Sequence, residues 1–254
     1  MITPDLIIAF LTLTFLEVVL GIDNIIFISI LSSRFPIEQR KKLMQIGLFL
    51  AMIMRVLLLM GVNWLTKMQN TWFYFDTEYF SSNISIQTLI LLTGGLFLIY
   101  KSTREIFDKV EADLGNETLE GKSTFSFSRA LFQIVLIDIV FSFDSILTAV
   151  GMTNGVPYAL FIMIAAVVIA ISIMIGFADP VSQFVNKHPS LQILGLSFLL
   201  LIGFMLITEA ASLSETVIFG SSISTIPKGY LYFAILFSLG VEMLNMRIKK
   251  AKRN

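Results

Sequence analysis

Seven apolar stretches recur along this chain and are long enough, or nearly so, to cross a lipid bilayer. They cover residues 6–30, 43–65, 86–100, 130–152, 157–178, 191–213 and 229–246. A helix needs roughly 20 mainly apolar residues to cross about 30 Å of hydrocarbon. The stretch at 86–100 is short, but Lys101 and Arg104 can extend it because long basic side chains reach the interface. The sequence therefore predicts an all-α polytopic membrane protein with seven transmembrane helices, none of them interrupted by proline.

The composition agrees with this class and excludes others. Hydrophobic residues make up 56% of the 254 residues and charged residues make up 14%, whereas a soluble domain carries about 25% charged residues. The formal net charge is zero, so we expect no nucleic-acid partner. The absence of cysteine rules out disulfides and thiolate metal sites. The lipid bilayer is the main partner that the composition indicates.

Basic residues in the loops predict the orientation of the spans. Counted by alternate loops, 14 of the 18 Lys and Arg fall on one side, and only Lys67 and Lys228 fall on the other. Cytoplasmic loops carry an excess of Lys and Arg, so we expect the basic tail at 247–254 in the cytoplasm and the N-terminus outside. The acidic segment at 109–125 then becomes a cytoplasmic connector between residues 1–108 and 126–213.

Two polar motifs lie within the first and fourth apolar stretches. EVVLGIDN at 17–24 and DIVFSFDS at 138–145 share the order acid, six-residue step, acid, small polar residue, and Gly21 matches Ser142. The first and fourth spans cross the membrane in opposite directions. The sequence therefore predicts, within a single transmembrane domain at 1–254, two inverted three-helix repeats plus a seventh helix at 229–246. Inverted repeats recur in secondary transporters.

Four carboxylates at matched depths favour a functional ion or proton site. Each costs at least about 2.5 kcal/mol to place at a helix centre. On a continuous helix the two acids of one motif would lie about 120° apart, so we expect an unwound turn near Gly21 and Ser142 that lets them converge. The predicted metal ligands are the acids and their polar neighbours: Glu17, Asp23, Asn24, Asp138, Asp144 and Ser145.

Arg55, near the middle of the second stretch, is the predicted counter-charge of this site. Two interpretations stay open: an entering cation displaces it, or it forms a structural ion pair with one acid. Lys101 and Glu209 are further candidates for charge compensation, although either could extend to the interface. Asn24 and Ser145, each taken alone, could instead form interhelical hydrogen bonds.

The motifs resemble the TerC family of integral membrane proteins. EVVLGIDNIIFISIL, GGLFLIYKSTREI and DIVFSFDSILTAVGM carry the resemblance, which extends over nearly all seven spans and is closest to the short, single-module bacterial branch. It implies a multi-pass protein of the bacterial cell membrane in the lysine-exporter superfamily, and a role in divalent-metal handling, chiefly manganese export. The acidic residues of the family carry over to Glu17, Asp23, Asp138 and Asp144.

We therefore expect a transporter of a divalent cation and not an enzyme, with proton exchange as a coupling reaction. An intramembrane aspartyl protease would leave Glu17 and Asp138 unexplained. With no Cys and with its single His in a loop, the chain offers mainly oxygen ligands, which favour Mn²⁺ or Ca²⁺ over Zn²⁺ and Cu⁺ as the transported ion. No further cofactor is expected.

Two alternatives and one question of assembly stay open. The chain could export a small organic cation or an amino acid, as the superfamily resemblance implies. It could instead be a non-transporting membrane partner in stress response or secretion, using its acidic connector. Assembly into a homo-oligomer is compatible with either function.

Overall fold

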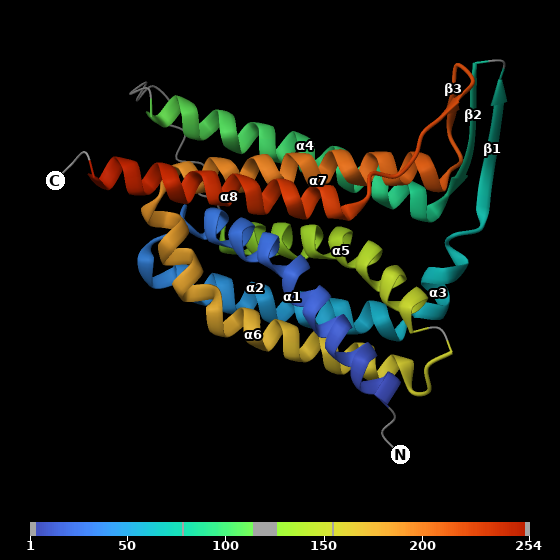
Figure 1. The fold of residues 1–254 in the computed structure, drawn as a ribbon, viewed down its shortest axis with the longest axis horizontal. Helices are drawn as coiled ribbons and strands as arrows, with labels where there is room; N and C mark the ends of the chain where they lie inside the picture. The colour runs from blue at the N-terminus through green and yellow to red at the C-terminus, as the bar shows by residue number, and fades with distance from the viewer. Residues whose placement is uncertain (1–3, 78, 114–125, 154, 252–254) are drawn as a thin grey trace. The chain divides into compact units, whose positions relative to one another are not determined.

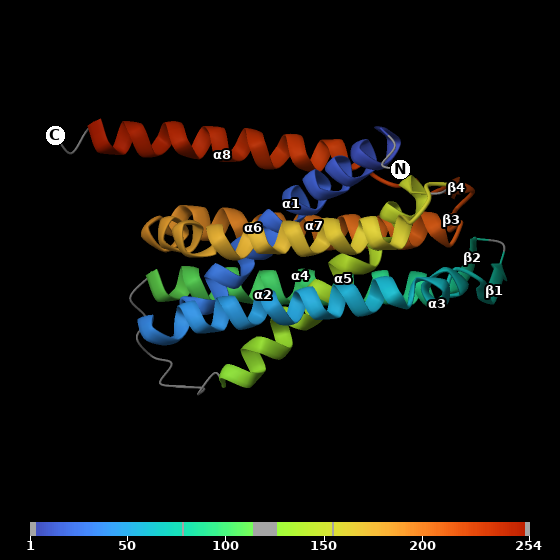
Figure 2. The same ribbon diagram turned by 90° about the horizontal axis from the view of Figure 1, so that it is seen from below.

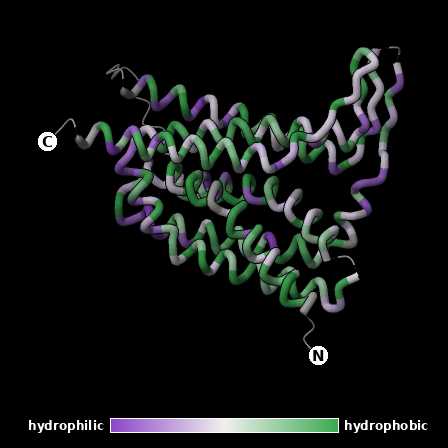
Figure 3. Tube along the Cα trace, in the orientation of Figure 1, coloured by the Kyte–Doolittle hydropathy of each residue, from purple (hydrophilic) through white to green (hydrophobic). Residues whose placement is uncertain are grey.

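Seven helices of the structure are long and apolar enough to cross a membrane. The computed structural model describes residues 4–77, 79–113, 126–153 and 155–251. The count of seven helices applies to these residues. They are α1 (Pro4–Ser32), α2 (Ile37–Met60), α4 (Ile86–Asp113), α5 (Phe127–Met152), α6 (Ala159–Lys187), α7 (Pro189–Leu213) and α8 (Lys228–Ala251). Apolar residues run along their length (Figure 3). The prediction of an all-α polytopic membrane protein is confirmed.

The helices group into two compact units. The first unit holds α1, α2, α5, α6 and the short α3 (Val62–Lys67), and the second holds α4, α7, α8 and four strands (Figures 1 and 2). In the predicted repeats, α1 and α2 would be equivalent to α5 and α6, which all lie in the first unit. The third helices, α4 and α7, would be equivalent to each other, and both lie in the second unit. An inverted repeat would produce such a pairing, and the repeat stays a prediction. Most of the connector at 109–125 lies outside the described residues.

In the second unit, α4 and α7 approach closely because glycine faces glycine. A Cβ atom on Gly95 would lie 2.6 Å from the backbone oxygen of Gly203, and a Cβ atom on Gly203 would lie 2.9 Å from the backbone oxygen of Gly95. Neither backbone oxygen can move without moving its helix. The two helices lie side by side (Figures 1 and 2), at a spacing that small residues allow in membrane proteins.

A four-stranded antiparallel sheet in the second unit was not predicted from the sequence. Its order is β1 (Thr71–Thr77), β2 (Phe80–Ser85), β3 (Val217–Ile218) and β4 (Ser221–Ser222). Phe219 and Gly220 turn β3 into β4 with φ angles of 50° and 77°, a geometry typical of tight hairpins. The aromatic sequence TWFYFDT suits β1, but all seven residues are exposed, so no alternation of apolar and polar residues marks the strand.

One expectation about the spans is wrong. The helices α1 and α5 continue through Gly21 and Ser142 without an unwound turn. A Cβ atom on Gly21 would instead overlap the Sδ atom of Met174 in α6, so Gly21 provides room for a neighbouring side chain. The helix α6 extends past residue 178, where its span was expected to end, and it continues through Pro180, so proline does not interrupt it. Proline removes only the hydrogen bond that would reach the carbonyl of Gly176, and membrane helices tolerate this loss.

Candidate functional site

Three charged side chains from three helices meet inside the first unit. Arg55 of α2 donates through Nη1 to Glu17 Oε2 of α1, and through Nη2 to Asp138 Oδ1 of α5 at 2.8 Å. Their exposed fractions are 2% for Arg55, 5% for Glu17 and 4% for Asp138. Buried charges need partners, and the planar guanidinium can serve two carboxylates at once because its donors point in fixed, different directions.

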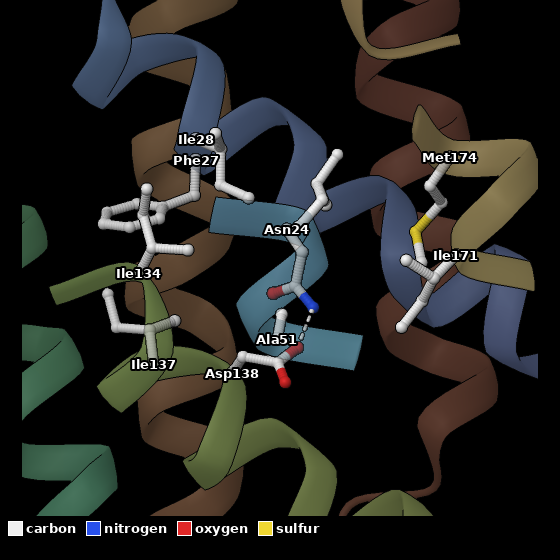
Figure 4. Close-up of a pocket in the computed structure, with 10 residues that line it drawn as sticks. Asn24, Phe27, Ile28, Ala51, Ile134, Ile137, Asp138, Ile171 and Met174 are labelled. Atoms are coloured by element: carbon white, nitrogen blue, oxygen red, sulfur yellow. Dashed lines mark hydrogen bonds between the residues drawn. The ribbon is translucent and has the colours of Figure 1, made fainter. Parts of the chain in front are cut away.

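Two uncharged side chains complete the hydrogen bonds of this cluster. Arg55 Nε donates to Ser142 Oγ at 2.9 Å, and Ser142 Oγ donates to Asp138 Oδ2 at 3.1 Å. Asn24 Nδ2 of α1 donates to Asp138 Oδ1 at 3.2 Å (Figure 4). Asp138 therefore accepts hydrogen bonds from three different residues. We refer to Glu17, Asn24, Arg55, Asp138 and Ser142 as the arginine cluster.

The arginine cluster holds two acids and one base. If both carboxylates are ionised, one negative charge remains uncompensated. A buried charge without a partner is strongly unfavourable, so the cluster should attract a proton or a cation. It can also exchange one for the other, because carboxylate oxygens accept protons and bind hard metal ions.

The structure brings three of the six predicted ligands together, namely Glu17, Asn24 and Asp138. Ser145 is buried, but its Oγ donates to the carbonyl oxygen of Ser142 at 3.3 Å, within its own helix. The positions of Asp23 and Asp144 lie within α1 and α5, and their side chains lie outside the described part of the structure. Among the side chains that are described, no group of three or more Asp, Glu, His or Cys residues could hold a metal ion.

The other predicted charges lie in the second unit. Lys101 pairs with Glu105 one turn along α4, at 2.8 Å, and Glu209 is half-buried on α7. Ser142 was not among the predicted ligands, because its match in the repeat is Gly21 and not a polar residue. The available signal was its spacing: it follows Asp138 by four residues, which places both on one face of a helix.

Two small cavities lie beside the arginine cluster. We call one the Asp138 cavity; its lining includes Asp138, Asn24, Ile28, Ala51, Ile137 and Met174. We call the other the Glu17 cavity; its lining includes Glu17, Leu13, Leu59, Ala149 and Met163. Each has a volume of about 10 Å³, which is room for about one water molecule. Apart from Asn24 and the two carboxylates, the lining of both cavities is apolar.

Comparison with known proteins gives similarity over the whole chain. The model of the family described as "Integral membrane protein TerC family" matches residues 2–254. The UPF0053 inner membrane protein YgdQ of Escherichia coli K12 is 45% identical over 243 residues, which are 96% of this chain and 93% of that protein. A UPF0053 protein of Haemophilus influenzae is 44% identical over 97% of this chain and 96% of its own length.

A longer relative matches this chain over less than half of its own length. The UPF0053 protein YegH of Escherichia coli K12 is 44% identical over 95% of this chain, and the match covers 42% of its length. No solved structure matches the chain.

Proposed function

Because the chain belongs to the TerC family of integral membrane proteins, we propose that it exports a divalent cation, Mn²⁺ first among them, across a bacterial inner membrane. The observation that carries this proposal is the arginine cluster, in which two carboxylates and one guanidinium are buried between three apolar helices. Relatives that are named inner membrane proteins and seven apolar helices support the location. The predicted orientation places the C-terminus in the cytoplasm.

The chemistry of the cluster suits a hard cation. Glu17 and Asp138 offer carboxylate oxygens and Asn24 offers an amide oxygen, which are the ligand types that Mn²⁺ and Ca²⁺ prefer. In the proposed mechanism Arg55 holds the two carboxylates while the site is empty. The entering ion takes its place, and Asp23, Asp144 and Ser145 supply further ligands. Taking up protons when the ion leaves would make the exchange electrically balanced.

The size of the cavities favours a metal ion over an organic cargo. The Asp138 and Glu17 cavities each have room for about one water molecule. A metal ion or a proton fits such a space, and an amino acid or an organic cation requires a much larger one. Export of an organic cation therefore remains the second hypothesis.

The decisive test is the metal content of cells with and without this protein, measured by elemental analysis across the divalent series. Cells that lack the protein should accumulate Mn²⁺, and the wild-type chain should restore the normal content. Asp138→Asn should not restore it, because it removes one charge of the cluster. Glu242→Gln is the matched control: this acid also lies in an apolar helix, α8, but its Oε1 accepts from Ser190 Oγ outside the cluster. An unchanged content of every metal, or equal failure of both variants, would refute the proposal.

A further inference from the structure

The two cavities lie on opposite sides of Arg55 along the helices that line them. On α2, Ala51 lines the Asp138 cavity and Leu59 lines the Glu17 cavity, four residues before and four residues after Arg55. At 1.5 Å per residue, they are about 12 Å apart along the helix. On α5, Ile137 lines the Asp138 cavity and Ala149 lines the Glu17 cavity. The arginine cluster therefore separates the two cavities.

The same order holds on the other two helices. On α1, Ile28 lines the Asp138 cavity and Leu13 the Glu17 cavity, and on α6 the corresponding residues are Met174 and Met163. The Asp138 cavity is thus displaced toward the α1–α2 turn, and the Glu17 cavity toward the α5–α6 turn. These two turns lie at opposite ends of the first unit (Figure 1).

We propose that the two cavities are the inner ends of separate access routes, which reach the arginine cluster from opposite faces of the membrane, and that Met174 closes the route to Asp138. This inference deepens the proposed transport function and rests on it for the identity of the cargo. Glu17 serves the route from the α5–α6 end, and Asp138 serves the route from the α1–α2 end. Arg55 lies between them, so no continuous path connects the two faces while it holds both carboxylates.

Met174 is placed to act as a movable plug. Its side chain lines the Asp138 cavity with Ile171, across from Ile134 and Ile137 (Figure 4). Its thioether lies against Gly21, where a Cβ atom would overlap Sδ and would lie 2.8 Å from Cε. The absence of a side chain on Gly21 therefore leaves a notch that holds the end of Met174. Methionine is unbranched and has three rotatable bonds, so it can leave the notch without a movement of α6.

A side chain at position 21 should change access in a defined way. In Gly21→Ala, the new Cβ atom occupies the notch and pushes the thioether toward the Asp138 cavity, which has room for only about one water molecule. In Met174→Ala, the plug is gone and the cavity is wider. The double variant carries the new methyl group but lacks the thioether that this group would displace. It should therefore regain the access that Gly21→Ala loses.

The absence of native cysteine allows a direct test with single cysteines. Ala51→Cys reports on the Asp138 cavity and Ala149→Cys on the Glu17 cavity. Each protein is placed in vesicles in chloride-free buffer, and Ag⁺, a monatomic ion that binds thiols and fits a cavity with room for about one water molecule, is added from one face or the other. Exposed Gln39, near the α1–α2 turn, and exposed Lys67 in α3 provide sidedness controls as Gln39→Cys and Lys67→Cys. Labelling after unfolding measures the total reactive thiol.

The proposal predicts opposite sidedness and a selective effect of Met174. Ala51→Cys should react only from the face that labels Gln39→Cys, and Ala149→Cys only from the opposite face. Met174→Ala should speed the labelling of Ala51→Cys several-fold, Gly21→Ala should slow it, and the double variant should return it toward the starting rate. None of these changes should alter the labelling of Ala149→Cys.

Three results would overturn the proposal. They are labelling of both cysteines from one face, no labelling in the folded protein when the unfolded protein labels fully, and equal effects of Met174→Ala on both positions. The labelling needs no transported ion. A chain that moves no Mn²⁺ but shows the expected labelling pattern would refute the proposed cargo and support the access routes. A chain that transports Mn²⁺ without this pattern would refute the access routes and support the cargo.

Discussion

Replacing Arg55 with methionine should strongly destabilise the first unit, because two buried carboxylates then lose their positive partner. Arg55 donates to Glu17, Ser142 and Asp138, and all four residues are at most 5% exposed. Removing one partner of a buried ion pair costs about 3–5 kcal/mol, since the other charge stays behind. Here two charges stay behind on neighbouring helices. We therefore expect Arg55→Met to cost at least about 3–5 kcal/mol of unfolding free energy.

Two comparison variants separate the loss of charge balance from the loss of packing. The triple variant Arg55→Met, Glu17→Gln, Asp138→Asn removes the stranded charges, and it should recover most of the stability because uncharged replacements of buried ion pairs are often nearly neutral. Arg55→Lys keeps the charge but loses the planar donors that reach three acceptors, so its stability should lie between those of wild type and Arg55→Met.

Thermal unfolding of detergent-solubilised protein provides the measurement, with the monodisperse fraction as the signal. A change of 1 kcal/mol shifts the melting temperature of a domain of 150–250 residues by about 2–4 °C, so Arg55→Met should melt about 6–20 °C below wild type. A shift below about 2 °C, or a triple variant as unstable as Arg55→Met, would show that the charges of the cluster do not interact as the geometry indicates.

Four further outcomes can be checked. A reporter that is active only in the cytoplasm should be active after the last residue and silent when inserted at Tyr79, between β1 and β2, because Lys and Arg concentrate in the loops assigned inside; the opposite pattern would overturn the predicted orientation. Asp23→Asn and Asp144→Asn should each abolish transport, and the double variant should be no worse than either, since residues that act as a unit are strongly non-additive; additive partial losses would point to two sites. In liposomes that contain a metal-sensitive dye, Mn²⁺ and Ca²⁺ should enter well ahead of Zn²⁺ and Cu⁺, and the reverse order would contradict the oxygen-ligand site. Gly95→Ala should lower the unfolding free energy by about 1–3 kcal/mol. The control Gly176→Ala, where a Cβ atom would meet nothing within 4 Å, should stay within about 1 kcal/mol of wild type, and equal effects would show that the close contact of α4 with α7 does not require glycine.

The features that could be predicted from the sequence are those in which a single segment would carry a large free-energy cost in the membrane. Seven spans follow from the length of each apolar stretch, because a helix in lipid satisfies its own backbone hydrogen bonds. Glu17, Arg55 and Asp138 could be singled out because a charge at the centre of a membrane helix is unfavourable without a partner. Each of these inferences needs one segment of chain and no knowledge of its neighbours.

The remaining features depend on contacts between distant segments. Arg55 is the only base near the middle of a span, but its simultaneous contact with α1 and α5 depends on how three helices are rotated against one another. The notch at Gly21 is visible only once Met174 of α6 is known to fill it. The strand β1 was missed because all its residues are exposed, so burial leaves no period of two in its sequence.

The contact between Gly95 and Gly203 also limits how such a chain can evolve. Each position excludes a side chain because of the backbone of the other, so a single substitution at either one meets a carbonyl oxygen that cannot move aside. A substitution at both positions would force α4 and α7 apart and open the whole seam between them. Among descendants of this sequence we therefore expect both glycines to persist, or both to change together with the larger residues that flank them.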